Sequence, residues 1–179
     1  MPIMLSATNV AIPVVADQFG LSATQITWIP MSYLMASVMF VLFFGKLADT
    51  LGRKKIFLTG LLVLSFSSIF VALANSGSVL LLGRFLQGFG AAMLYATQTA
   101  MVSSVYPAKE RGKAIGITLS AVYLGLALGP TLGGIVMEYL NWRLNFVLHF
   151  PLTLIIILLI HQVPNDSSNK LLQEFKFDK

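Results

Sequence analysis

Long apolar stretches separated by short charged segments are the main feature of the sequence. Six stretches contain no charged residue, and these are 1–16, 18–45, 56–83, 85–108, 114–137 and 144–165. About 20 apolar residues in an α-helix are enough to cross the hydrocarbon core of a bilayer, and every stretch except the first is longer than that. The pattern predicts a polytopic, all-α membrane protein.

These stretches predict six helices. Only Arg84 interrupts residues 56–108, which are too many for one helix, and the turn-forming sequence NSGS at 75–78 divides them. The helices are expected at about 2–16, 27–44, 56–74, 79–102, 113–137 and 146–163. The first is too short to span the membrane alone. Residues 1–163 are expected to form one six-helix unit, followed by a polar tail at 164–179 that is a linker or a short amphipathic surface helix.

The composition supports the membrane interpretation and excludes several functional classes. Apolar residues make up 56% of the chain and charged residues 11%, about half the charged share of ordinary soluble domains. The absence of cysteine excludes disulfides, thiolate metal sites and cysteine nucleophiles. The sequence also has no paired carboxylates within a predicted helix, no nucleotide-binding loop and no metal-ligand cluster, so it indicates neither an enzyme nor a cofactor or metal site.

Basic residues between the predicted helices set the expected orientation. Seven of them lie in the connections at 45–55 and 107–113, whereas Arg143 is the only basic residue in the opposite connections. Because cytoplasmic connections are enriched in Lys and Arg, both basic connections and the tail are expected in the cytoplasm. The short basic connections also argue against a nucleic-acid-binding surface.

The connection at 45–55 has the sequence GKLADTLGRKK, which places one acid between two glycines. Gly45 and Gly52 permit a tight turn, and Asp49 is expected to pair with an arginine or to cap a helix. Such a contact would hold one conformation and release in another. The alternative is a topology signal with one incidental acid.

Arg84 is the only permanent charge in the interior of a predicted helix, since Lys113 is the first residue of its own. Charged residues within the membrane usually face an interior cavity or a partner, and Gln87 lies on the same helix face, three residues on. The alternative is that the Arg84 side chain extends to the membrane surface, because it lies near the outer end of its helix. The sequence leaves both alternatives open.

The predicted helix at 113–137 contains glycines at every fourth position, namely Gly125, Gly129 and Gly133. This spacing gives a smooth face for close helix packing, and Pro130 is expected to kink the helix. The sequence is compatible with plain helix packing and with a flexible helix at a gate.

In this order, the three motifs resemble signature motifs of the major facilitator superfamily of transporters. The segment 45–55 is similar to the motif G-x-L-a-D-r-x-G-r-k, except that Thr50 stands where a base is usual. Arg84, Gln87 and Gly88 match R-x-x-q-G, and residues 125–134 match g-x-x-x-G-P-x-x-G-G of the antiporter branches. Residues 9–13 and 142–151 add similarities to the fourteen-helix drug:proton antiporters. Where that branch usually has an acid in the first helix, this sequence has Met4.

The resemblance implies a role for each motif. The cytoplasmic latch that biases alternating access would consist of Gly45, Asp49, Gly52 and Arg53. Proton coupling would depend on Arg84, Gln87 and Gly88. The fifth helix would be shaped, and leakage limited, by Gly125, Gly129, Pro130, Gly133 and Gly134. Candidates for lining the central cavity are Asn9, Tyr95 and Gln98.

By resemblance, the chain is expected to be the N-terminal six-helix half of a longer transporter, starting within the first helix. The implied function is proton-coupled efflux of small apolar or cationic drug-like compounds through the plasma membrane, without a cofactor. Its expected partners are the small-molecule substrate, protons, the bilayer and a second transporter half, and not nucleic acid. The alternatives are a transporter of one specific metabolite, or a non-transporting fragment that needs a second half.

Overall fold

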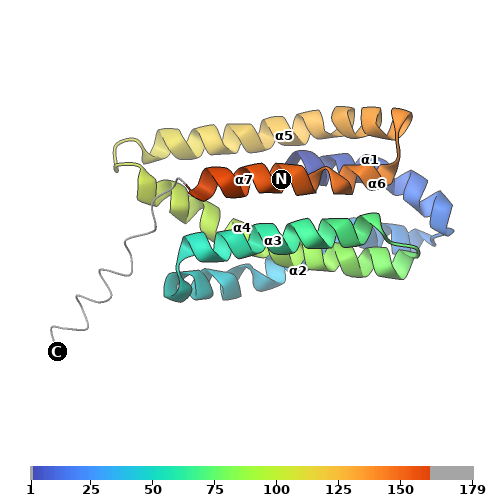
Figure 1. Ribbon diagram of the computed structural model, residues 1–179, viewed down its shortest axis with the longest axis horizontal. Coiled ribbons are helices and arrows are strands. Elements are labelled where there is room, and N and C mark those ends of the chain that lie inside the picture. The colour runs from blue at the N-terminus through green and yellow to red at the C-terminus, as the bar shows by residue number, and fades with distance from the viewer. Residues whose placement is uncertain (1, 162–179) are drawn as a thin grey trace.

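A computed structural model describes residues 2–161, and this part of the chain is built from helices alone. The helices are α1 (Pro2–Phe19), α2 (Ala23–Leu51), α3 (Arg53–Ala72), α4 (Gly77–Val105), α5 (Arg111–Tyr139), α6 (Trp142–Val147) and α7 (His149–His161). They lie roughly side by side along the long axis of the molecule (Figure 1). Five segments are long and apolar enough to cross a membrane, with α6 and α7 together forming one of them. The predicted all-helical membrane fold is therefore confirmed, while the expectation for the tail at 164–179 lies outside the described residues.

The helices pack in two groups. Helix α4 packs extensively against both α2 and α3, and α5 packs mainly against α1. Helices α6 and α7 connect the groups, because α6 contacts α1 and both contact α3; they lie between α5 and α3 in Figure 1. Contact between α4 and α5 is much smaller, and this leaves space between the two groups.

The helices extend beyond the apolar stretches that predicted them. Helix α2 starts at Ala23 because Ser22 and Gln25 form a capping box, in which each side chain bonds to the other residue's backbone N–H. Helix α4 starts after Ser76, whose hydroxyl accepts from the Val79 N–H. Hydropathy marks only the membrane-embedded part of a helix, whereas capping residues determine where the helix begins.

The sixth predicted helix, expected at 146–163, is instead divided into α6 and α7. It starts earlier, at Trp142, since the Asn141 side chain accepts from the Arg143 N–H at 3.0 Å. The division falls at Leu148. Pro151 has no N–H to donate to the carbonyl of Val147, four residues earlier, and its ring crowds that carbonyl. The break therefore lies where the sequence removes a helical hydrogen bond.

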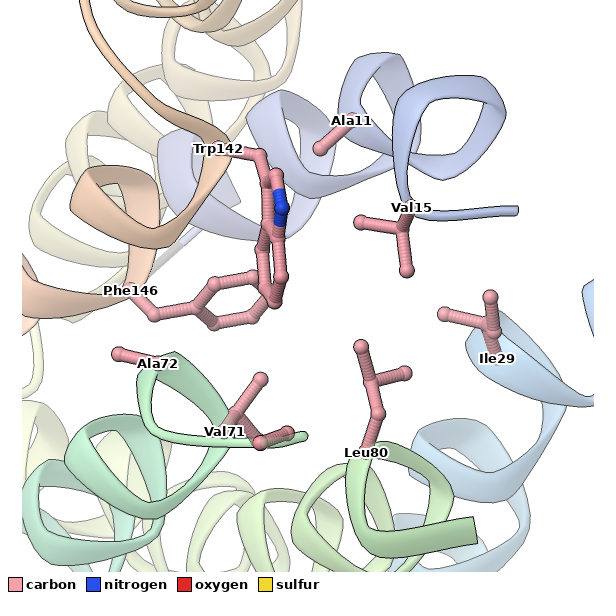
Figure 2. Packing of buried hydrophobic residues seen from close by; sticks show 9 residues of the cluster. Ala11, Val15, Ile29, Val71, Ala72, Leu80, Trp142 and Phe146 are labelled. Atoms are coloured by element: carbon pink, nitrogen blue, oxygen red, sulfur yellow. The ribbon is translucent and has the colours of Figure 1, made fainter. Parts of the chain in front are cut away.

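An apolar cluster joins α1, α2, α3, α4 and α6 at one end of the bundle. Its side chains converge around Trp142 and Phe146 (Figure 2). The Trp142 Nε1–H donates to Gln18 at 2.7 Å, and Arg143 Nη1 donates to the carbonyls of Ala72 and Ala74. The start of α6 is thus bonded to the ends of α1 and α3, which fixes this end of the bundle.

Candidate functional site

Arg84 lies inside the bundle, with only 3% of its surface exposed. Its Nε–H donates to the carbonyl of Ile29 at 3.3 Å, and its Nη1 donates to Gln87 Oε1 at 2.8 Å. The guanidinium also lies over the ring of Tyr33, with Cζ 4.8 Å from the ring centroid. The sequence left open whether Arg84 faces the interior or extends to the membrane surface, and in the structure it faces the interior.

Gln87 links Arg84 to the neighbouring helix α3. While its Oε1 accepts from Arg84, its Nε2 donates to the Ser68 hydroxyl at 2.7 Å. Ser68 in turn donates to the carbonyl of Leu64 at 2.7 Å. Gln87 and Ser68 are both almost completely buried. The chain of hydrogen bonds therefore fixes Arg84 against α2 and α3 together, which makes its position sensitive to movement of either helix.

Tyr33 is the residue that the motifs did not indicate. Its ring covers Arg84, and its hydroxyl lies 3.0 Å from the hydroxyl of Tyr95 on α4. Its position on α2, one turn from Ile29, places it on the helix face that meets Arg84. The spacing of Ile29 and Tyr33 can be read from the sequence, but only the packing of α2 against α4 shows that both residues contact Arg84.

A cavity of about 250 Å³ lies beside the tyrosine pair, between the two helix groups. Its lining comes from α2, α3, α4, α5 and α7 and consists of Tyr33, Phe57, Leu61, Leu64, Ala91, Leu94, Tyr95, Gln98, Leu119, Val122, Leu126 and Ile156. Two of the predicted cavity residues, Tyr95 and Gln98, are therefore brought together here. Asn9 is exposed on α1 and does not belong to this lining.

Three buried polar atoms have no hydrogen-bond partner in the described part of the chain. They are Arg84 Nη2, Asn145 Nδ2 and His149 Nδ1. Leu80 and Phe146 belong to the same apolar cluster, and Arg84 and His149 each lie about one helical turn beyond them. Helices α4 and α6–α7 start at the same end of the bundle, so these polar residues share a layer next to the cluster.

In the first motif, Asp49 and Arg53 form an ion pair across the sharp turn between α2 and α3. Arg53 Nη2 donates to Asp49 Oδ1 at 3.3 Å, and the Asp49 side chain is 67% exposed. Gly52 has a φ of 96°, which favours glycine and lets α3 begin directly after α2. No atom lies within 4 Å of a Cβ built at Gly45, so no close approach requires a glycine there.

Gly88 brings α4 and α2 into close contact. A Cβ at this position would collide with the carbonyl oxygen of Tyr33 and would lie 2.9 Å from the Cβ of Ala36. Gly90 plays the same part toward α3, since a Cβ there would lie 2.8 Å from the Leu64 nitrogen. Gly88 therefore allows the close packing that places Arg84 against Tyr33.

The glycine-rich motif on α5 faces α1. Gly125, Gly129 and Gly133 are buried, and the Ser6 hydroxyl donates to the Leu126 carbonyl at 2.7 Å. Pro130 lies within α5, which continues past it to Tyr139. The motif thus provides a packing face for α1, as its spacing suggested.

Replacing Gly133 with alanine is expected to destabilise the chain, whereas replacing its neighbour Gly134 is not. A Cβ at Gly133 would lie 2.7 Å from Cα and Cβ of Ala7, while no atom lies within 4 Å of one at Gly134. Overpacking of this kind costs about 1–3 kcal/mol. Thermal unfolding of the purified chain in detergent measures the difference. Equal melting temperatures of the two variants would contradict the α1–α5 packing.

Comparison with known proteins agrees with this fold. The profile of the Major Facilitator Superfamily matches residues 1–176. Among curated relatives, the chain is 36% identical to "Riboflavin transporter RibZ" of Clostridioides difficile (strain 630), over 86% of this chain and 34% of that protein. It is 33% identical to "Multidrug resistance protein Stp" of Mycobacterium tuberculosis (strain ATCC 25618 / H37Rv), over 93% of this chain and 31% of that protein. The chain spans about one third of the length of these relatives.

A solved structure gives the same result for the fold. The inward-open xylose transporter XylE from E. coli superposes with a TM-score of 0.74 at 16% identity, over 93% of this chain and 46% of XylE. At this identity the likeness concerns the fold alone. The described helices thus correspond to about half of a transporter fold.

Proposed function

The chain belongs to the major facilitator superfamily, and on this premise we propose that it forms the N-terminal half of a secondary active transporter in the plasma membrane. The transporter exports small, mainly apolar compounds in exchange for protons, by alternating access. A second six-helix half completes the transport pathway. This proposal is supported by the match to the family and by relatives that are named a multidrug resistance protein and a multidrug transporter protein.

The buried Arg84 is the observation that carries the proposal. A permanent charge inside a membrane-spanning helix is costly, about 2.5–3.5 kcal/mol on insertion scales, and is usually retained for function. Arg84 contacts α2 directly and α3 through Gln87. A change in the spacing of these helices would therefore alter the surroundings of the charge. In this way helix movement would change the proton affinity of groups near Arg84.

The other two motifs have supporting roles in this proposal. Asp49 and Arg53 act as the latch of the cytoplasmic turn, and their exposed ion pair is weak enough to break and re-form during transport. The buried glycines of α5 keep α1 close to α5 and limit leakage. Tyr95 and Gln98 line the solute cavity from α4, and Asn9 is proposed to face the second half.

Efflux measurements test the proposal. Cells that express the complete transporter containing this chain are loaded with a neutral fluorescent dye, and its release is followed with and without a protonophore. Release that exceeds that of cells with empty vector and stops when the proton gradient is collapsed is expected. Release at an unchanged rate without the gradient would contradict proton coupling.

Transport of one specific metabolite is the second candidate. It is supported by the relative named a riboflavin transporter, which is 36% identical to this chain. The same efflux system separates the two candidates, because a panel of unrelated apolar dyes is exported only by a transporter of broad specificity.

We expect the turn between α2 and α3 to face the cytoplasm and the turn between α3 and α4 to face outside. The reason is the excess of basic residues in the first turn. Because the chain has no cysteine, Lys55→Cys and Ser78→Cys each introduce one thiol at an exposed position. An impermeant thiol reagent on intact cells should label residue 78 alone, and both after permeabilisation. Labelling of residue 55 alone on intact cells would show that the topology is the opposite of the one expected.

A further inference from the structure

The interior of the described bundle contains a cation and no carboxylate. Residues 2–161 hold four acids, and each lies in the terminal turn of a helix or next to its end: Asp17, Asp49, Glu110 and Glu138. Arg84 is buried about two turns inside α4, and it contacts only a carbonyl, an amide oxygen and an aromatic ring. Its charge is therefore not balanced within the described part of the chain, and the positive potential extends into the low-dielectric surroundings.

Space for a solute lies beside Tyr33, in the cavity of about 250 Å³. Tyr33 both lines this cavity and carries Arg84 against its ring. One aromatic face at the cavity wall is thus already occupied by an internal cation. A cationic solute would lose that cation–π partner and would meet the repulsion of Arg84 as well.

The polar groups of the cavity favour a solute with hydrogen-bond acceptors. Tyr33 and Tyr95 share one hydrogen bond, in which either hydroxyl is the donor, so the second O–H of the pair can donate to a solute. Gln98 adds an amide N–H₂ group. The rest of the lining is apolar, with Phe57 and leucine side chains that suit the ring system of a solute.

We propose that this cavity binds aromatic solutes that carry a carboxylate and disfavours aromatic cations. The inference rests on the proposed transport function and narrows its substrate class. It also departs from the cationic compounds that the sequence resemblance implied. The carboxylate would accept from the tyrosine pair and Gln98, while Arg84, behind Tyr33, supplies the favourable potential.

Binding of three naphthalene probes that differ in charge tests the proposal. The chain in phosphatidylcholine nanodiscs is titrated at pH 7 with 2-naphthoate, 2-naphthamide and 2-naphthylmethylammonium, and probe fluorescence is corrected with protein-free nanodiscs. We expect 2-naphthoate to bind about tenfold more tightly than the ammonium probe, with the amide between them. Equal or tighter binding of the ammonium probe, or no binding of any probe, would overturn the proposal.

Two variants of Arg84 and one matched control locate the source of the preference. Arg84→Gln should reduce the ratio of the two charged probes to near one, while Arg84→Lys should keep most of it. Lys113→Gln removes an equal charge from an exposed position at the start of α5 and should leave the ratio unchanged. A ratio that survives Arg84→Gln in a folded protein would overturn the assignment. If Arg84→Gln does not fold, the order of the three probes on the parent chain and on Arg84→Lys decides.

The outcome is separable from that of the transport proposal. Gradient-driven dye efflux together with a preference for the ammonium probe would overturn the charge preference alone. A preference for 2-naphthoate without any efflux would support the binding site and overturn the transport function.

Discussion

Replacing Arg84 with alanine is expected to abolish proton-coupled efflux by the transporter that contains this chain, at near-normal levels in the membrane. A buried cation disfavours the protonation of groups near it and attracts anions. Proton coupling requires a group whose proton affinity differs between two conformations of the transporter. Removing the cation therefore removes the cause of that difference. Membrane insertion should not suffer, because alanine avoids the cost of placing a charge in the bilayer.

Arg84→Lys is expected to retain only part of the transport. The guanidinium donates through Nε to Ile29 and through Nη1 to Gln87 at the same time. A lysine ammonium is a single point of charge without the planar fork and does not reproduce both contacts in the same geometry. The lysine variant thus separates the contribution of the charge from that of its position.

Transport rates, normalised to membrane protein and measured across external pH, decide the question. Lys113→Ala is the matched control, because it removes a positive charge from an exposed position on α5. If Arg84→Ala transports as well as the parent at every pH, the coupling role is wrong. Loss of transport in Lys113→Ala as well would show that the effect is one of overall charge.

The five apolar spans and their helical nature could be predicted from the sequence, but the ends of the helices and the division of the last span could not. Uncharged stretches reflect the hydrocarbon core directly, because a charge there is costly. Helix ends lie in the interfacial region and depend on local hydrogen bonds, such as those of the Ser22–Gln25 capping box and of Ser76. The division of the last span at Leu148 depends on Pro151, whose effect a hydropathy pattern does not register.

The surroundings of Arg84 were only half predictable. The contact with Gln87 follows from helix geometry, since residues three apart share a face. The contacts with Ile29, Tyr33 and Ser68 come from helices far away in the sequence. Hydropathy and residue spacing do not indicate which helices pair, so the choice between an interior and a surface arginine needed the tertiary structure.

The glycines of the three motifs look equivalent in the sequence, yet their surroundings differ. Gly52 is required by its positive φ, and Gly133 by the closeness of Ala7. Gly45 and Gly134 have open space where a Cβ would be. Spacing predicts that a face is smooth, but only the neighbouring helix determines which glycine on it is indispensable.

A valine at Gly88 is expected to destabilise the chain severely, because the backbone of α2 lies directly against α4 at this glycine. A Cβ there would overlap the carbonyl oxygen of Tyr33, and a backbone atom cannot rotate away as a flexible side chain does. The strain is relieved only if α2 and α4 move apart. That movement would also draw the Ile29 carbonyl and the Tyr33 ring away from Arg84, so the buried charge would lose partners at the same time.

The expected effect is a melting temperature lowered by about 10 °C for Gly88→Val, given a cost of about 3 kcal/mol for overpacking in a chain of this size. Gly88→Ala should fall between this variant and the parent. Gly116→Val is the matched control, because it places the same side chain inside α5 with no atom within 4 Å of its Cβ. Unfolding in detergent can be followed by circular dichroism. If Gly88→Val and Gly116→Val melt at the same temperature, α2 and α4 do not pack as closely as in the structure. The contact of Arg84 with Tyr33, which depends on that packing, would then also be contradicted.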